Sequence, residues 1–168
     1  MEMKINKVTN QKFLCEGPDR KIIISKGKNK TLGYAGMVCK NKKNLERYKE
    51  FLKQNKCKIN HFVSEFYQSG SFSLHDPDNN MICFGVSKKE NTFVTKGIYA
   101  PLQHLTFASK DVEKFQNFYH KKLGFQVSDR VVKSNGELAT CFTTSNHEHH
   151  TIACFKSSQS GIDHHSYE

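Results

Sequence analysis

The feature that most constrains the fold is a strand pattern that occurs three times in the 168-residue chain. Leu32-Gly-Tyr34, Leu102-Gln-His104 and Ile162-Asp-His164 occupy equivalent places, 70 residues apart for the first two copies and 60 for the last two. A helix pattern and three short apolar runs follow each of the first two copies. Repeated units of this kind bury their apolar faces against one another. The sequence therefore predicts an α+β fold of tandem βαβββ modules, with the last module incomplete.

Hydrophobic periodicity and turn residues predict the individual elements. A hairpin is expected over 13–16 and 21–25, then strand 32–38, helix 44–55, strands 61–66, 70–75 and 81–86, strand 102–108, a helix from Asp111 to Gly124, and strands 125–132, 138–144, 150–156 and 162–168. Asp111 is expected to cap its helix and Gly124 to end it. Asp76-Pro-Asp-Asn-Asn80 is expected to form a tight turn, with an asparagine in the left-handed region. The buried helix faces are predicted as Leu45, Tyr48, Phe51 and Leu52, and as Val112, Phe115, Phe118, Tyr119 and Leu123.

The repeat also predicts the domain organisation. Residues 1–30 are expected to be the C-terminal hairpin of a preceding module, 31–95 and 96–160 two complete modules, and 161–168 the first strand of another. On this interpretation the chain is a fragment, truncated at both ends.

Charge and composition narrow the classes of partner that this chain is expected to bind. The net charge is +10, but only three of the 26 basic residues are arginines, and the lysines are spread along the chain. Because arginine is the better reader of phosphates and bases, this pattern argues against nucleic-acid binding. No apolar run is long enough to cross a bilayer, and no signal peptide is seen at the start, so a cytoplasmic protein without membrane contact is expected. The six cysteines form no C-x-x-C pair and are expected to be reduced.

Histidines mark the candidate site. A single histidine such as His104 is usually structural, but His164 at the equivalent repeat position favours a pair of metal ligands. His165 cannot share that role, since adjacent strand residues face opposite sides, and the repeat alignment selects His164. The cluster around His150 can be a solvated loop, a zinc site or an acid/base residue beside a metal held elsewhere. In the last case His149 is expected to point away.

These residues resemble the type I extradiol ring-cleavage dioxygenases of the vicinal oxygen chelate (glyoxalase/bleomycin resistance/dioxygenase) superfamily, such as catechol 2,3-dioxygenase and 2,3-dihydroxybiphenyl 1,2-dioxygenase. The resemblance rests on the strand of His104, on Phe118-Tyr-His-Lys-Lys-Leu-Gly-Phe125, on His149-His-Thr-Ile-Ala153 and on Gly161-Ile-Asp-His-His-Ser-Tyr-Glu168, with the turn 76–80 as a weaker signature.

The resemblance implies extradiol cleavage of a catechol-type substrate by O₂ at a non-haem Fe(II) site, with Mn(II) as a second metal. It implies His104 and His164 as metal ligands and His150 as the catalytic acid/base. Tyr34 and Cys83 replace ligands in the first module, which is therefore expected to bind no metal. The carboxylate ligand of such enzymes is not found here, and Glu168 resembles a routine position, so this chain alone is expected to be inactive. The alternatives are a glyoxalase-like isomerase, a metal-dependent resistance protein, or a degenerate binding module whose histidines are structural. Homo-oligomers formed through exposed strand edges are a further expectation.

Overall fold

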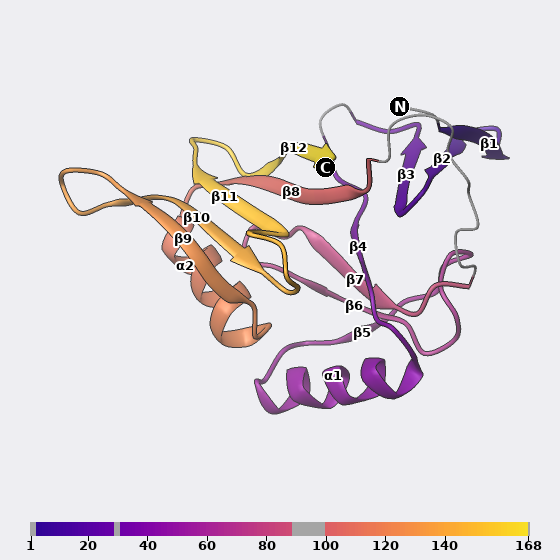
Figure 1. Ribbon diagram of the computed structural model, residues 1–168, viewed down its shortest axis with the longest axis horizontal. Coiled ribbons are helices and arrows are strands. Elements are labelled where there is room, and N and C mark those ends of the chain that lie inside the picture. Colours follow the sequence, from indigo (N-terminus) through magenta and orange to yellow (C-terminus); the bar gives the residue numbers. More distant parts are fainter. Residues whose placement is uncertain (1–2, 29–30, 89–99, 168) are drawn as a thin grey trace.

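A computed structural model describes residues 3–28, 31–88 and 100–167 of the chain. Glu168 and residues 89–99, which include the start of the module expected over 96–160, lie outside these ranges. The described residues form three sheets. In Figure 1 the sheet of β8 to β12 lies above that of β4 to β7, and the sheet of β1 to β3 lies at the upper right. The prediction of a mixed α+β architecture is confirmed.

The predicted repeat is visible as two βαβββ units in sequence. The first consists of β4 (Ala35–Val38), α1 (Lys42–Gln54), β5 (Asn60–His61), β6 (Phe72–His75) and β7 (Met81–Gly85). The second consists of β8 (Leu102–Ser109), α2 (Val112–Asn117) with the π-helical turn η1 (Phe118–Lys122), β9 (Gln126–Val132), β10 (Leu138–Thr144) and β11 (Ile152–Lys156).

Both units have the same sheet topology. The strand order is β4-β7-β6-β5 in the first and β8-β11-β10-β9 in the second, so each unit places its first strand beside its last. The two strands of that pair run parallel in both units, and the remaining pairs are antiparallel. β12 (Gly161–Tyr167) then adds an antiparallel neighbour to the other side of β8. β8 is therefore an interior strand of a five-stranded sheet.

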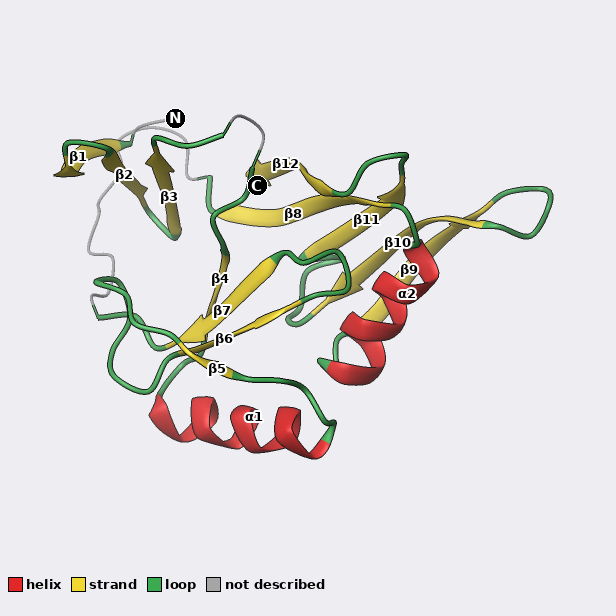
Figure 2. Cartoon of the chain, turned by 180° about the vertical axis from the view of Figure 1, so that it is seen from behind, coloured by secondary structure: helices red, strands yellow, loops and turns green. Residues whose placement is uncertain are grey.

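Capping side chains and buried apolar faces stabilise the two helices. The side chain of Asn41 accepts a hydrogen bond from the Asn44 N–H at 2.9 Å, and Asp111 accepts one from the Lys114 N–H, also at 2.9 Å. Each bond satisfies one of the free N–H groups of the first helical turn. The cap predicted at Asp111 is confirmed. As Figure 2 shows, α2 covers one face of the five-stranded sheet, and α1 lies beneath the sheet of the first unit.

The second helix ends where the sequence predicts. Gly124 has φ +77°, which a residue with a side chain rarely adopts, and it follows Leu123, the C-cap residue of the helical segment. The predicted buried stripe is confirmed, except that Phe118 is only half-buried. The last turn is π-helical rather than α-helical, which no residue pattern indicated.

The two units share one hydrophobic core, which includes residues from both helices and both sheets. At the junction, the Tyr119 hydroxyl donates to Oδ2 of Asp76 at 3.3 Å, and the Tyr48 hydroxyl donates to the Leu123 carbonyl at 2.9 Å. Asp76 also stabilises the turn in which it lies, because its Oδ1 accepts hydrogen bonds from the N–H groups of Asp78 and Asn80 at 2.9 and 2.8 Å. The left-handed residue predicted in this turn is Asn79, with φ +66°.

The N-terminal segment forms a three-stranded sheet of β1 (Lys4–Thr9), β2 (Lys12–Gly17) and β3 (Arg20–Ser25). The hairpin of β2 and β3 was predicted, whereas β1 was not. Arg20 joins this sheet to the second unit: its side chain is buried, and Nη1 donates to the Ala100 carbonyl at 2.6 Å. Its guanidinium also lies 6.0 Å from the ring centre of Tyr167 on β12.

Two further predictions are wrong in detail. The strand expected over 61–66 is reduced to Asn60–His61, because the chain turns away at Ser64, whose hydroxyl accepts the Phe66 N–H at 3.2 Å. Phe51 was expected to be buried but remains 39% exposed, since it packs at the helix edge against Gly124.

All six cysteines are free thiols in the structure. No helix in the three described ranges is both long and apolar enough to span a bilayer.

Candidate metal and acid/base site

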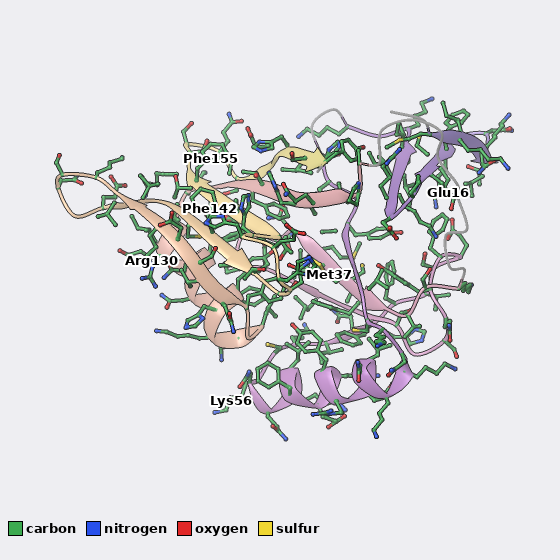
Figure 3. All side chains as sticks on the ribbon, in the orientation of Figure 1. Glu16, Met37, Lys56, Arg130, Phe142 and Phe155 are labelled. Carbon is green, nitrogen blue, oxygen red and sulfur yellow. The ribbon has the colours of Figure 1, made fainter. Side chains whose placement is uncertain are left out.

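Strand register determines which side chains share one face of the five-stranded sheet. Aligned residues on neighbouring strands form a row across it, from β9 to β12: Asp129, Phe142, Ala153, Thr106 and His164. Because side chains alternate along a strand, the neighbouring row of Cys141, Cys154 and Phe107 faces the opposite side, where α2 packs. We call the first face the site face and the second the core face. Figure 3 shows the position of Phe142 within this sheet.

His104 and His164 meet on the site face. His104 lies two residues before Thr106 on β8, so both point to the same side, and His164 is aligned with Thr106. Their ring centres are 5.7 Å apart. His165 is instead aligned with Leu105, on the core face, and its ring lies 5.3 Å from that of Tyr167. The structure thus brings His164, rather than His165, to His104.

His150 joins the pair from the loop before β11. Its ring centre is 4.2 Å from that of His104 and 5.0 Å from that of Phe142. His150 lies two residues before β11 begins at Ile152, which is aligned with Leu105, the neighbour of His104 on β8. The three histidines predicted from sequence are therefore neighbours in space, although 60 residues separate the first from the last.

The prediction that His149 points away from the metal stays a prediction. Nδ1 of His149 lies 3.0 Å from Nδ1 of His150, and the two rings are nearly perpendicular. The prediction assumed that strand alternation extends to residue 149. The strand starts only at Ile152, so residues 149 and 150 lie in a loop where alternation does not apply.

Burial and mutual repulsion keep two of these imidazoles in the neutral form. The pKa of His104 is lowered by burial and, to a smaller extent, by the neighbouring imidazoles of His150 and His164. The pKa of His150 is lowered by burial and then by His149 and His164. Since a metal binds the lone pair of a neutral imidazole, the same environment favours metal binding at His104.

The described residues do not supply a complete metal site. No three of their His, Cys, Asp or Glu side chains are arranged to hold one ion. The carboxylate of Asp163 lies beside one of the two histidines, with Oδ2 2.6 Å from Nδ1 of His164. Asp163 therefore contacts a nitrogen of the histidine itself, and it was not predicted from the sequence to have a role.

The equivalent face of the first unit is packed with aromatic side chains. Tyr34, which takes the repeat position of His104, lies just before β4, and its ring centre is 5.3 Å from that of Phe62. Cys83 on β7 is fully buried, and burial raises the pKa of its thiol to about 12. A thiol held in this neutral form is a poor metal ligand. The metal-free character of this unit stays a prediction.

Both the sequence and the fold of this chain are similar to those of known proteins. Residues 102–167 match the family model described as Glyoxalase/Bleomycin resistance protein/Dioxygenase superfamily. No curated protein matches the sequence. Among solved structures, a catechol 2,3-dioxygenase superposes with a TM-score of 0.75 and 21% identity, covering 97% of this chain and 65% of that one.

Two other solved structures show the same likeness. A variant of homoprotocatechuate 2,3-dioxygenase from Brevibacterium fuscum has a TM-score of 0.78 and 13% identity, covering 98% of this chain and 49% of that one. The Mn(II)-bound glyoxalase from Novosphingobium aromaticivorans has a TM-score of 0.73 and 14% identity, covering 97% of this chain and 56% of that one. The chain thus spans between about half and two thirds of the length of these proteins.

The family match covers the segment that contains His104, His150 and His164, and the structural matches cover nearly the whole chain. At these identities the structural matches establish the fold. The chain therefore has the vicinal oxygen chelate fold of extradiol dioxygenases and glyoxalases, and its segment 102–167 matches the Glyoxalase/Bleomycin resistance protein/Dioxygenase superfamily.

Proposed function

We propose that His104 and His164 are two ligands of a divalent metal, with His150 as the acid/base residue, in an extradiol dioxygenase that opens catechol-type rings with O₂. The observation that carries this proposal is the convergence of three histidines on one sheet face, at ring distances of 4.2 and 5.7 Å. The catechol dioxygenase structures support the reaction class, since they share the fold around these residues.

The donor chemistry fits Fe(II), with Mn(II) as a second metal. Two imidazoles and one carboxylate, with the remaining positions open, are typical of non-haem Fe(II) oxygenases. The pair of His104 and His164 would provide the two imidazoles. The third ligand has to come from outside the described residues or from an added carboxylate, because these residues hold no complete set. When bound, Fe(II) would supply Lewis acidity and reactivity towards O₂.

The surrounding side chains indicate what the protein would contribute. His150 is half-buried and neutral at ordinary pH, because burial lowers its pKa. A neutral imidazole beside the site can accept a proton from a phenolic hydroxyl and return it later. Phe142, which is half-buried beside His150 on the site face, provides apolar surface for an aromatic ring. We also propose that the functional units follow the repeat, as modules over 31–95 and 96–160.

Iron retention tests the ligand assignment before any turnover is measured. Under anaerobic conditions, dialysis against Fe(II) should leave less bound iron in His104→Ala and in His164→Ala than in the wild type. His165→Ala is the matched control, because its ring lies on the opposite face, and it should retain iron like the wild type. Equal retention by all four proteins would contradict the assignment and favour structural histidines.

Turnover is measured next with catechol in air, through the absorbance of the yellow ring-opened product. Acetate is added in a parallel series, because a free carboxylate can fill the position of the third ligand. We expect little or no product without acetate and more product with it. In the acetate series, His150→Ala should retain iron but slow ring opening. Unchanged kinetics in that variant would remove His150 from the acid/base role.

A glyoxalase-like isomerase is the second candidate, favoured by the structural match to the Mn(II)-bound glyoxalase. The same protein loaded with Mn(II) can be assayed with the adduct of methylglyoxal and glutathione. Turnover of this adduct, without activity towards catechol, would support the isomerase over the dioxygenase.

A further inference from the structure

The pairing of β8 with β12 contains two irregularities, one on each strand, and each falls directly before a site histidine. Ile162 is aligned with Phe107 and His164 with Thr106, so Asp163 is an extra residue on β12. Ser166 is aligned with His104 and Tyr167 with Leu102, so Gln103 is an extra residue on β8. These are β-bulges, which change the direction of a side chain and are common beside functional sites.

Each bulge places a polar acceptor on Nδ1 of the histidine that follows it. In a regular strand, Asp163 and His164 would point to opposite faces. With the bulge, Asp163 Oδ2 lies 2.6 Å from Nδ1 of His164, and Gln103 Oε1 lies 3.2 Å from Nδ1 of His104. Neither oxygen can donate a hydrogen bond, so each contact requires that Nδ1 carry the hydrogen.

A neutral imidazole carries one N–H, and its other nitrogen has the lone pair that binds a metal. If Nδ1 carries the hydrogen in both histidines, Nε2 is the metal-binding atom in both. His150 follows the same pattern without a bulge, since its Nδ1 contacts the side chain of the preceding residue, His149, at 3.0 Å. All three site histidines are thus contacted at Nδ1 by the residue immediately before them.

We propose that Asp163 and Gln103 are positioning residues that fix the ligand histidines His164 and His104 with Nδ1 protonated and Nε2 free for the metal. This inference rests on the proposed metal site for its purpose, but the tautomers themselves can be measured without a metal. The carboxylate of Asp163 is charged and its contact is the shorter, so it should have the larger effect.

The test is nitrogen-15 NMR of the metal-free protein, labelled at histidine, at a pH where the imidazoles are neutral. Long-range couplings identify the protonated nitrogen, and His164 and His104 are assigned from the signals that disappear on replacement. In Asp163→Ala, we expect the population ratio of the two His164 tautomers to shift towards Nε2–H by about fivefold, the size expected for losing one hydrogen bond. Gln103→Ala should shift His104 in the same direction by less.

Two variants separate positioning from a general effect of charge. Asp163→Asn keeps an oxygen acceptor and should retain the wild-type tautomer of His164. Asp129→Ala removes an exposed carboxylate from β9, the other edge of the same sheet, and should leave His164 unchanged. An unchanged tautomer ratio in Asp163→Ala, with the fold intact by circular dichroism, would overturn the proposal.

A second readout connects the tautomer to the metal. Loss of a partner that orients a ligand histidine typically weakens metal binding by about 10–100-fold. The dissociation constant for Mn(II) should therefore rise by this order in Asp163→Ala and much less in Asp163→Asn. Equal affinities in the two variants would overturn the positioning role. If the wild-type chain bound no Mn(II), the proposed function would be in doubt, whereas the NMR result would still decide the tautomer.

Discussion

The contact between the two repeated units can be tested at a single hydroxyl group. Tyr119 is fully buried on η1, and its hydroxyl donates to Asp76 Oδ2, in the turn of the first unit, at 3.3 Å. Tyr119→Phe removes this bond and leaves the ring in place. Hydrogen bonds to charged groups contribute about 1.5–3 kcal/mol, and the long distance favours the lower end, about 1.5 kcal/mol.

Unfolding measurements can detect a loss of this size. For a chain of this length, 1.5 kcal/mol corresponds to a fall in Tm of about 3–6 °C. Urea unfolding of the wild type, Tyr119→Phe, Asp76→Asn and the double variant gives the coupling between the two groups. We expect a coupling free energy of about 1 kcal/mol. A loss below about 0.5 kcal/mol in Tyr119→Phe, or additive effects in the double variant, would refute the view that this bond joins the units.

Three other changes have defined outcomes. Burial raises the pKa of Asp76 above its ordinary 3.8, so the folded state binds this proton more tightly and the free energy of unfolding falls as pH rises from 3.8 through the folded pKa. In urea titrations, Asp76→Asn should lack this fall, and an identical pH profile would contradict the prediction. Gly124→Ala should lower stability by about 1–2 kcal/mol, because φ is +77° and the new Cβ would lie 3.0 Å from Phe51; an unchanged Tm would argue against strain. Phe107→Ala should cost about 3–5 kcal/mol in urea unfolding, since its ring is fully buried, and a loss below 1 kcal/mol would show that the core closes around the gap.

Local rules explain why much of the fold could be predicted from the sequence. The repeat of Leu102-Gln-His104 and Ile162-Asp-His164 identified both strands correctly and selected His164 over His165 for the site face. Asp111 and Gly124 marked the ends of the second helical segment, because capping needs specific residue types at specific places. Each of these inferences depends on contacts within a few residues or on comparison between repeats.

The remaining features depend on pairing between distant strands. The bulges at Gln103 and Asp163 are defined only by the register of β8 against β12, which the residues of either strand do not specify alone. For the same reason, the sequence did not indicate that Asp163 or Gln103 contacts a histidine. The start of β11 was predicted two residues too early, so residues 149 and 150 lie in a loop where strand alternation does not decide the direction of a side chain.

The two faces of the five-stranded sheet separate the residues of the site from the residues that stabilise the fold. On β8, Phe107 faces a core that both units share, while His104 and Thr106 face the site, so neighbouring residues on one strand serve different purposes. A change at His104 removes few core contacts and should affect metal binding more than folding. The bulge at Asp163 lies between Ile162, which is aligned with Phe107 on the core face, and His164, which is aligned with Thr106 on the site face. Irregular pairing at this sheet edge can therefore adjust the site histidines while the packed face of the fold stays unchanged.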